Sequence, residues 1–184
     1  MKALIILAEG FEEIEAVTPM DTLRRADVEV VTAGVSGRHI KGAHGISVSA
    51  DIELKDAPDD ADVVVLPGGL PGASNLASEP KVLELIRLQI KRDKWIAAIC
   101  ASPALVLEPA GVLSGRSATC YPGFEKHFGA STRFLSDRVV VDGKIITSRG
   151  PGTALEFSLK IVEKLIGLQK SEELRSGMIS QPVG

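Results

Sequence analysis

The sequence predicts an α/β protein in which a mostly parallel sheet carries helices on both faces and an added β-hairpin. Continuous apolar runs without polar alternation recur along the chain, as expected of strands that are buried on both faces of a parallel sheet. Stretches with helical periodicity separate these runs. Strands and helices therefore alternate along the chain, which is typical of α/β folds.

Three apolar runs are predicted to form buried strands. They cover residues 3–8, 63–66 and 96–99, and none of them contains a polar side chain. Residues 139–147 carry an Asp-Gly pair between two β-branched runs, which is the signal of a tight hairpin turn. This hairpin is predicted as an addition to the parallel strands.

Three stretches have the periodicity of helices. Residues 13–25 form the first, which Pro19 interrupts, and residues 80–92 form the second, whose initial proline suits a first helical turn. Residues 152–167 form the third, and Gly167 stands where a C-terminal cap is expected. The side chains expected to face the sheet from the last two helices are Val82, Leu83, Ile86, Ile90, Leu155, Leu159, Val162 and Ile166.

Composition and organisation favour one ordinary globular domain over residues 1–184. The chain has no internal repeat, low-complexity segment or Ser/Pro-rich linker, and its 45% apolar content is enough for a single core. Two cysteines are too few for a disulfide framework. We recognise neither an export signal nor an apolar stretch that could span a membrane, so we expect a cytoplasmic protein with reduced thiols.

The charge balance argues against a surface that binds nucleic acids. The chain has 21 basic and 24 acidic residues, a net charge of -3, and only 4% of its residues are aromatic. Its densest basic cluster is no more than Arg24 and Arg25. We therefore expect a small-molecule site or a protein partner, and no sequence-specific nucleic-acid ligand.

Cys100 follows a buried run at the carboxyl end of the predicted sheet, where open α/β proteins bind ligands. Its neighbours Ala98 and Ser102 are small, as a nucleophile on a sharp strand-to-helix turn requires. Pro103 marks a helix start, so backbone N–H groups, that of Ala101 among them, are expected to favour the thiolate. Spacing alone leaves open the alternative that Cys100 is a small buried hydrophobic residue.

Two other segments follow buried runs. Gly68 and Gly69 either present backbone N–H donors to a developing oxyanion or form a permissive turn. Helical spacing places Glu12 and Glu15 near one side of the first helix. A glutamate that faces the sheet end has a raised pKa and can share a proton with the thiol, whereas a solvated one cannot. Cys120 has no comparable setting and is interpreted as a packing residue or a surface thiol.

Four segments share the sequence pattern of a known superfamily. They are AEGFEEIE at residues 8–15, VVLPGG at 64–69, AAICA at 97–101 and TSRGPGT at 147–153. In this order along the chain, they resemble the ThiJ/PfpI superfamily, in the branch around the human Parkinson-associated protein DJ-one and the bacterial YajL-like proteins. The resemblance implies a flavodoxin-like three-layer sandwich that forms a homodimer.

The resemblance also implies roles for particular residues. Cys100 is expected to be the reactive thiol, and Glu15 the protonated carboxyl group that hydrogen-bonds its sulfur. Gly68 and Gly69 are expected to place backbone amides beside that sulfur.

The chain departs from the family pattern at two positions. Protease-like members have a histidine directly after the cysteine, where this sequence has Ala101, so we predict no protease activity. Human-like members have a histidine before a downstream proline, where this sequence has Tyr121, whose phenol can line the pocket but is a poor base near neutral pH. His127 either folds back toward the site or lies at the surface. The three histidines lack ligand-like spacing, so no metal site is expected.

We therefore expect a cofactor-independent cysteine enzyme, a lyase or hydrolase that acts on reactive carbonyls. As a glutathione-independent glyoxalase it would add Cys100 to the aldehyde of methylglyoxal, and Glu15 would move a proton between the two carbons before lactate is released. Removal of glycation adducts from proteins or nucleotides, a deglycase activity, would use the same residues. The alternative is an oxidative-stress sensor or redox-regulated chaperone, in which Cys100 is oxidised without turnover.

Overall fold

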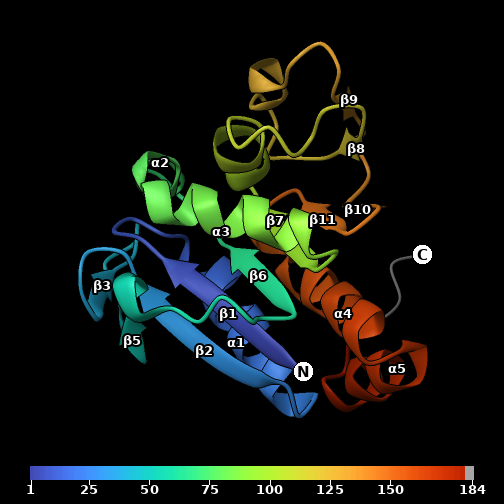
Figure 1. Ribbon diagram of the computed structural model, residues 1–184. Helices are drawn as coiled ribbons and strands as arrows, with labels where there is room; N and C mark the ends of the chain where they lie inside the picture. The colour runs from blue at the N-terminus through green and yellow to red at the C-terminus, as the bar shows by residue number, and fades with distance from the viewer. Residues whose placement is uncertain (181–184) are drawn as a thin grey trace.

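The computed structural model describes residues 1–180, and a seven-stranded sheet forms its centre (Figure 1). Neighbouring strands are parallel except for one antiparallel pair at an edge of the sheet. This pair is the hairpin predicted from the Asp-Gly signal. The predicted α/β class, with a mostly parallel sheet and an added hairpin, is confirmed. Across the sheet, the strands are β10 (Val139–Asp142), β11 (Ile145–Ser148), β7 (Trp95–Ile99), β6 (Val63–Leu66), β1 (Lys2–Leu7), β2 (Glu29–Gly34) and β5 (Ile52–Glu53).

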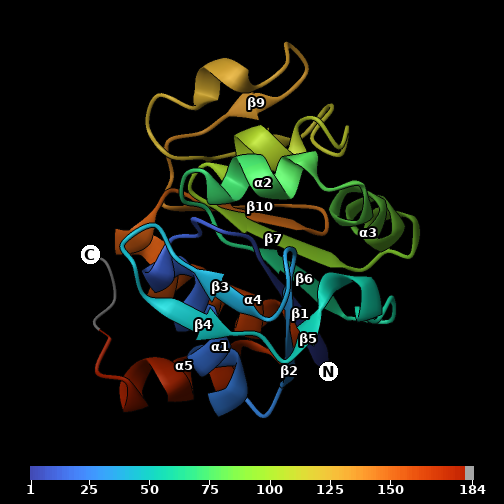
Figure 2. The same ribbon diagram turned by 90° about the vertical axis from the view of Figure 1, so that its left-hand side faces the viewer.

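Helices cover both faces of the sheet (Figure 2). On one face, α1 (Glu13–Arg25) and α4 (Ala154–Leu165) pack against the strands, and α5 (Leu168–Gly177) packs against α4. On the other face lie α2 (Gly72–Ser78), α3 (Pro80–Lys91) and a single turn of π-helix, Pro103–Leu107. The flavodoxin-like three-layer arrangement is therefore confirmed.

Side chains of the central strands enter two separate apolar cores. Ile5 of β1 packs in one core with Leu23 of α1 and Phe157 of α4. Its neighbour Leu4 packs in the other core with Ile86 of α3. Because successive side chains of a strand point to opposite faces, a strand covered on both sides needs apolar residues at every position. This burial explains the continuous apolar runs.

Two details of the helices differ from the prediction. The first helix continues through Pro19 instead of breaking there, because a proline removes one hydrogen bond while the apolar face of α1 stays packed on the sheet. Leu155 of α4 is only half-buried, and Ile166, directly after the helix, is exposed. The large side chain of Phe157 lies in the core with Ile161 instead, and this contact sets the rotation of the helix.

Several short elements were not predicted from periodicity. β3 (His39–Lys41) and β4 (Ser47–Ser49) form an antiparallel pair, and β8 (Ser117–Ala118) pairs with β9 (Arg133–Phe134). The loop from β3 to β4 lies against the carboxyl end of β1, where the N–H of Gly10 donates to Lys41 O (2.8 Å) and the N–H of Ala43 donates to Phe11 O (2.8 Å). Strands of two or three residues are too short for an alternation signal.

The single-domain prediction for residues 1–184 stays a prediction, and residues 181–184 lie outside the described residues. Over residues 1–180, none of the helices combines the length and apolar character that a membrane crossing requires. Cys100 and Cys120 are both free thiols in the described structure. The cytoplasmic location stays a prediction.

Candidate active site

Cys100 lies on a sharp turn directly after β7. Its φ of +66° is rare for a residue with a Cβ, so the surrounding chain must hold the turn in place. The N–H of Cys100 donates to Ser148 O (2.9 Å), and its carbonyl accepts from the N–H of Tyr121 (2.8 Å). The small Ser102 packs inside the turn, where its Oγ donates to Pro67 O (2.5 Å). The strand-to-helix turn expected from the spacing is present.

The helical segment after the turn is shorter than expected. It consists of five residues, Pro103–Leu107, wound as a π-helix. A single turn aligns few peptide dipoles, so it contributes little positive potential at the sulfur of Cys100. Burial has the opposite effect, because it raises the pKa of the thiol. The N–H of Ala101 lowers the pKa of the thiol, as expected, but burial has the larger effect.

Glu15 reaches the same turn from the start of α1 and is fully buried. Its Oε2 accepts the backbone N–H of Gly68 at 2.9 Å. Its Oε1 accepts no hydrogen bond from the described residues, although the carboxyl group interacts with the side chain of Cys100. A buried carboxylate oxygen without a donor is costly. A proton on the carboxyl group lowers this cost, because the group is then neutral.

The thiol and the carboxyl group compete for one proton. Burial raises the pKa of Glu15 to about 7, although the N–H of Gly68 and the contact with Cys100 lower it. Burial, and then the charge of an ionised Glu15, raise the pKa of the Cys100 thiol to about 12, whereas the N–H groups of Gly69 and Ala101 lower it. The contribution of Glu15 acts only while Glu15 is ionised. Once protonated, Glu15 stabilises a thiolate by donating to it, so the two groups titrate as a pair.

The two glycines after β6 have different functions in the structure. The N–H of Gly68 is already bonded to Glu15, so it is not free for a substrate oxygen as the sequence had suggested. Gly69 has φ +88°, and its N–H and that of Ala101 interact with the sulfur of Cys100. Gly69 and Ala101 are therefore the backbone donors beside the reactive atom.

A cavity of about 480 Å³ opens over the thiol. Tyr121 lines it, as expected, but His127 is not among the lining residues. The ring of His127 instead packs behind Phe124, with 5.8 Å between the ring centroids. The lining residues are Glu12, Ile14, His44, Gly69, Leu70, Cys100, Ala101, Tyr121, Phe124 and Pro151. A volume of this size is typical of small-molecule sites.

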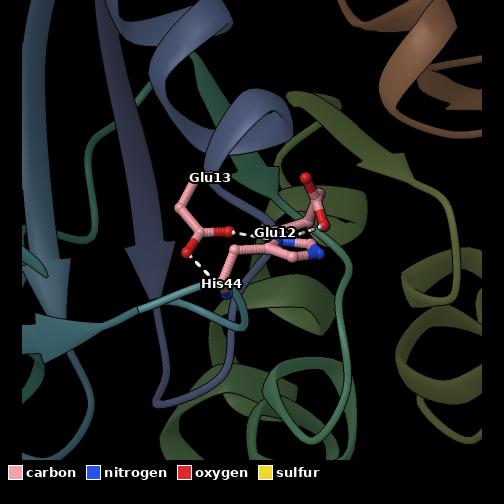
Figure 3. Close-up of side chains that lie close together, drawn as sticks. All are labelled: Glu12, Glu13 and His44. Atoms are coloured by element: carbon pink, nitrogen blue, oxygen red, sulfur yellow. Dashed lines mark hydrogen bonds and ion pairs between the residues drawn. The ribbon is translucent and has the colours of Figure 1, made fainter. Parts of the chain in front are cut away.

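Sequence reasoning missed a cluster at the mouth of this cavity. One ligand atom each of Glu12, Glu13 and His44 lies within 4.8 Å of the others. Figure 3 shows the three side chains close together. Such a group could hold a metal ion, but His44 Nδ1 is already bonded to Glu13 Oε2 (3.0 Å). We assign no metal here, because an ion would have to displace this hydrogen bond. The cluster was hard to find because His44 is about 30 residues away in the chain.

Cys120 lies outside the cavity lining and is fully buried. Burial, and then the charge of Glu125, raise the pKa of its thiol to about 12. This setting agrees with the interpretation as a packing residue and not with that as a surface thiol.

Comparison with known sequences relates nearly the whole chain to DJ-1 proteins. A sequence model of the DJ-1/PfpI family matches residues 1–164. Protein dj-1beta of Drosophila melanogaster is 44% identical over 180 residues, which are 96% of this chain and 96% of that protein. The glutathione-independent glyoxalase DJR-1.2 of Caenorhabditis elegans is 41% identical over 174 residues, 94% of this chain and 92% of that protein. The chain spans only 42% of another relative, Protein DJ-1 homolog B of Arabidopsis thaliana, to which it is 40% identical over 183 residues, 98% of this chain.

Solved structures agree with this similarity. The crystal structure of Drosophila melanogaster DJ-1beta has a TM-score of 0.94 and 42% identity to this chain and covers 98% of each chain. Toxoplasma gondii DJ-1, in a structure described as oxidized, has a TM-score of 0.93 and 38% identity over 97% of each chain. The likeness therefore covers both sequence and fold.

Proposed function

Because the chain belongs to the DJ-1/PfpI family, we propose that it is a cofactor-independent, glutathione-independent glyoxalase that converts methylglyoxal into lactate. The observation that carries the proposal is the buried Glu15 carboxyl group, with a donor-free oxygen, beside the Cys100 sulfur at the base of a cavity. A thiol and a carboxyl group that share one proton are what addition to an aldehyde followed by proton transfer requires. The relative from Caenorhabditis elegans bears the name of this activity.

The first step forms a bond between the sulfur of Cys100 and the aldehyde carbon, C1. The C1 oxygen takes up the electron pair of the carbonyl bond and becomes an alkoxide. The N–H groups of Gly69 and Ala101 interact with the sulfur, which supports a role for them in stabilising this charge. Glu15 then gives its proton to the alkoxide, which leaves a hemithioacetal and a carboxylate.

The second step moves hydrogen from C1 to C2. The Glu15 carboxylate removes the C1 hydrogen as a proton, and the same group returns a proton to C2. In the same step the C1 hydroxyl loses its proton and the C2 oxygen gains one. The product is a thioester of lactate on Cys100. Water hydrolyses the thioester, which releases lactate and restores the proton shared by Cys100 and Glu15. The sum is methylglyoxal plus water giving lactic acid.

The lining of the cavity suits a small substrate that carries an apolar group next to a reactive carbonyl. Ile14, Leu70 and Phe124 offer apolar surface to the methyl group. The volume exceeds what a three-carbon substrate fills, so an aldehyde carried as an early adduct on a protein or nucleotide amine is a second substrate class of this proposal. Deglycation would use the same attack by Cys100.

We extend the proposal to a homodimer. Ile14 and Val17 lie on α1 with exposed fractions of 53% and 45%, and Ile46 on the adjacent loop is 59% exposed. Apolar side chains gathered on one surface are typical of a contact between subunits. Sedimentation equilibrium should give twice the mass of the chain, and Val17→Glu should shift it toward the monomer, whereas a monomeric wild type would contradict the dimer.

The proposal is tested with methylglyoxal in a buffer that contains neither glutathione nor amines. Lactate is measured for the wild type and for Cys120→Ser, which changes the thiol outside the cavity. We expect many turnovers from both proteins. Absence of lactate, together with oxidation of Cys100 by one equivalent of peroxide, would overturn the proposal in favour of an oxidation sensor.

A further inference from the structure

His44 is held in a fixed position at the mouth of the cavity. It lies on the loop between β3 and β4, and its backbone N–H donates to Glu13 Oε1 (2.7 Å). Its Nδ1 lies 3.0 Å from Glu13 Oε2, so both oxygens of one buried carboxylate hold this residue. Figure 3 shows the imidazole between the carboxyl groups of Glu13 and Glu12. The contacts orient the ring although 70% of its side chain is exposed.

The loop around His44 is built to keep this contact. Gly42 has no room for a side chain, because a Cβ there would lie 2.3 Å from Glu13 Oε1. The N–H of Ile46 also donates to Glu13 Oε1 (3.3 Å), and the N–H of Ala43 donates to Phe11 O (2.8 Å). These hydrogen bonds hold the loop against the start of α1, so His44 is positioned before any ligand binds.

His44 is the one histidine among the residues that line the cavity. Because Glu13 accepts from Nδ1, that nitrogen carries a proton, and Nε2 is the nitrogen that remains for a ligand. The other ionisable groups of the lining are the thiol of Cys100, the carboxyl group of Glu12 and the phenol of Tyr121. The proposed reaction also needs a proton donor at the second carbonyl oxygen, and Cys100 and Glu15 are already committed to the sulfur and carbon atoms.

We propose that His44 is the general acid of the reaction, a role that rests on the proposed glyoxalase function. As the Glu15 carboxylate takes the C1 hydrogen as a proton, the electron pair moves to the C2 carbonyl and Nε2–H of His44 gives its proton to the C2 oxygen. When Glu15 returns a proton to C2, the C1 hydroxyl gives its proton to Nε2 and becomes the thioester carbonyl. His44 ends each turnover in its starting state, and no other reactant is consumed.

The charges around His44 favour the acidic form. The hydrogen bond to Glu13, and then the negative charge of Glu12, raise the pKa of His44 above its ordinary value of 6.5. Both carboxylates come from the start of α1, and no further charged side chain of the described residues lies in an ion pair with the ring. At neutral pH the imidazole is therefore more protonated than a free histidine, as a proton donor requires.

The role of His44 is tested with the variant His44→Asn and one control variant. In His44→Asn, the side-chain amide can still donate to Glu13, but the variant has no proton donor at the position of Nε2. We expect kcat to fall about 100-fold, the typical contribution of a general acid, with KM and the melting temperature little changed. His39→Asn is the matched control, because His39 bonds to Ser49 and does not line the cavity, and it should keep the wild-type kcat.

Two further readouts separate catalysis from loop placement. Imidazole in the buffer should restore turnover to His44→Ala, whereas it cannot restore activity lost through a displaced loop. The alkylation rate of Cys100 should be the same in the wild type and in His44→Asn. Wild-type turnover by His44→Asn, or failure of imidazole to rescue His44→Ala, would overturn this inference while the proposed function stands. A wild type without turnover would overturn the proposed function itself, and the role of His44 with it.

Discussion

The backbone of Gly68 passes so close to Cys100 that a Cβ on Gly68 would lie 2.6 Å from the Cβ of Cys100. The same atom would lie 2.8 Å from Glu15 Oε2 and 2.9 Å from Ile99 O. The N–H of Gly68 also holds Glu15 at 2.9 Å. The loop after β6 can pack this closely against Cys100 and Glu15 only because residue 68 has no side chain.

Gly68→Ala should disrupt both the fold near the site and turnover. The added methyl group meets backbone and buried atoms that cannot move aside, and such overpacking costs about 1–3 kcal/mol. The free energy of unfolding, measured by urea titration, checks this. The control is Gly177→Ala at the end of α5, where a Cβ meets nothing within 4 Å. Equal stabilities of the two variants would show that the contact at Gly68 is not as tight as described.

Glu15→Gln should change how stability depends on pH. The pKa of Glu15 is raised from 4.5 to about 7 in the folded state, so this residue stabilises the fold below pH 4.5 and its contribution is lost as pH rises through 7. A shift of this size corresponds to about 3 kcal/mol, as an order of magnitude. Gln cannot ionise, so the variant should be more stable than the wild type at pH 8. Unfolding by urea at pH 5 and pH 8 measures the difference, and parallel pH dependences would contradict the buried, protonated carboxyl group.

The two thiols should react with alkylating agents at very different rates. Cys100 is 9% exposed and faces the cavity, whereas Cys120 is fully buried away from it. Iodoacetamide on the native protein should therefore modify Cys100 alone, as peptide mass spectrometry can show. In urea both thiols should be modified, which serves as the control. Modification of native Cys120 at the rate of Cys100 would mean that the packing around Cys120 opens readily.

Much of the fold could be predicted because burial leaves a signal in the chain. Strands covered on both faces must be apolar throughout, and β1, β6 and β7 were found from this pattern. The rotation of α4 could not be predicted in the same way. Its helix has apolar residues on more than one side, and only contact with the sheet decides that Phe157 and not Ile166 is buried.

Some residues of the site could likewise be predicted from the sequence, and others could not. Cys100 and Glu15 stand in segments with a recognisable local pattern, so their proximity could be predicted from the strand ends and from the family resemblance. His44 could not, because it reaches the cavity through a hairpin of two three-residue strands that carry no periodic signal. His127, which was considered instead, is closer to Tyr121 in the chain but lies behind Phe124 in space.

Cys100 and Glu15 are proposed to act together in turnover. The most direct test compares lactate formation from methylglyoxal by the wild type, Cys100→Ser and Glu15→Gln at pH 7, with folding checked by circular dichroism. We predict that Cys100→Ser forms no lactate above background and that Glu15→Gln, which cannot move a proton from C1 to C2, loses at least about 100-fold in kcat. Lactate formation at the wild-type rate by either folded variant would show that its missing group is not needed for turnover.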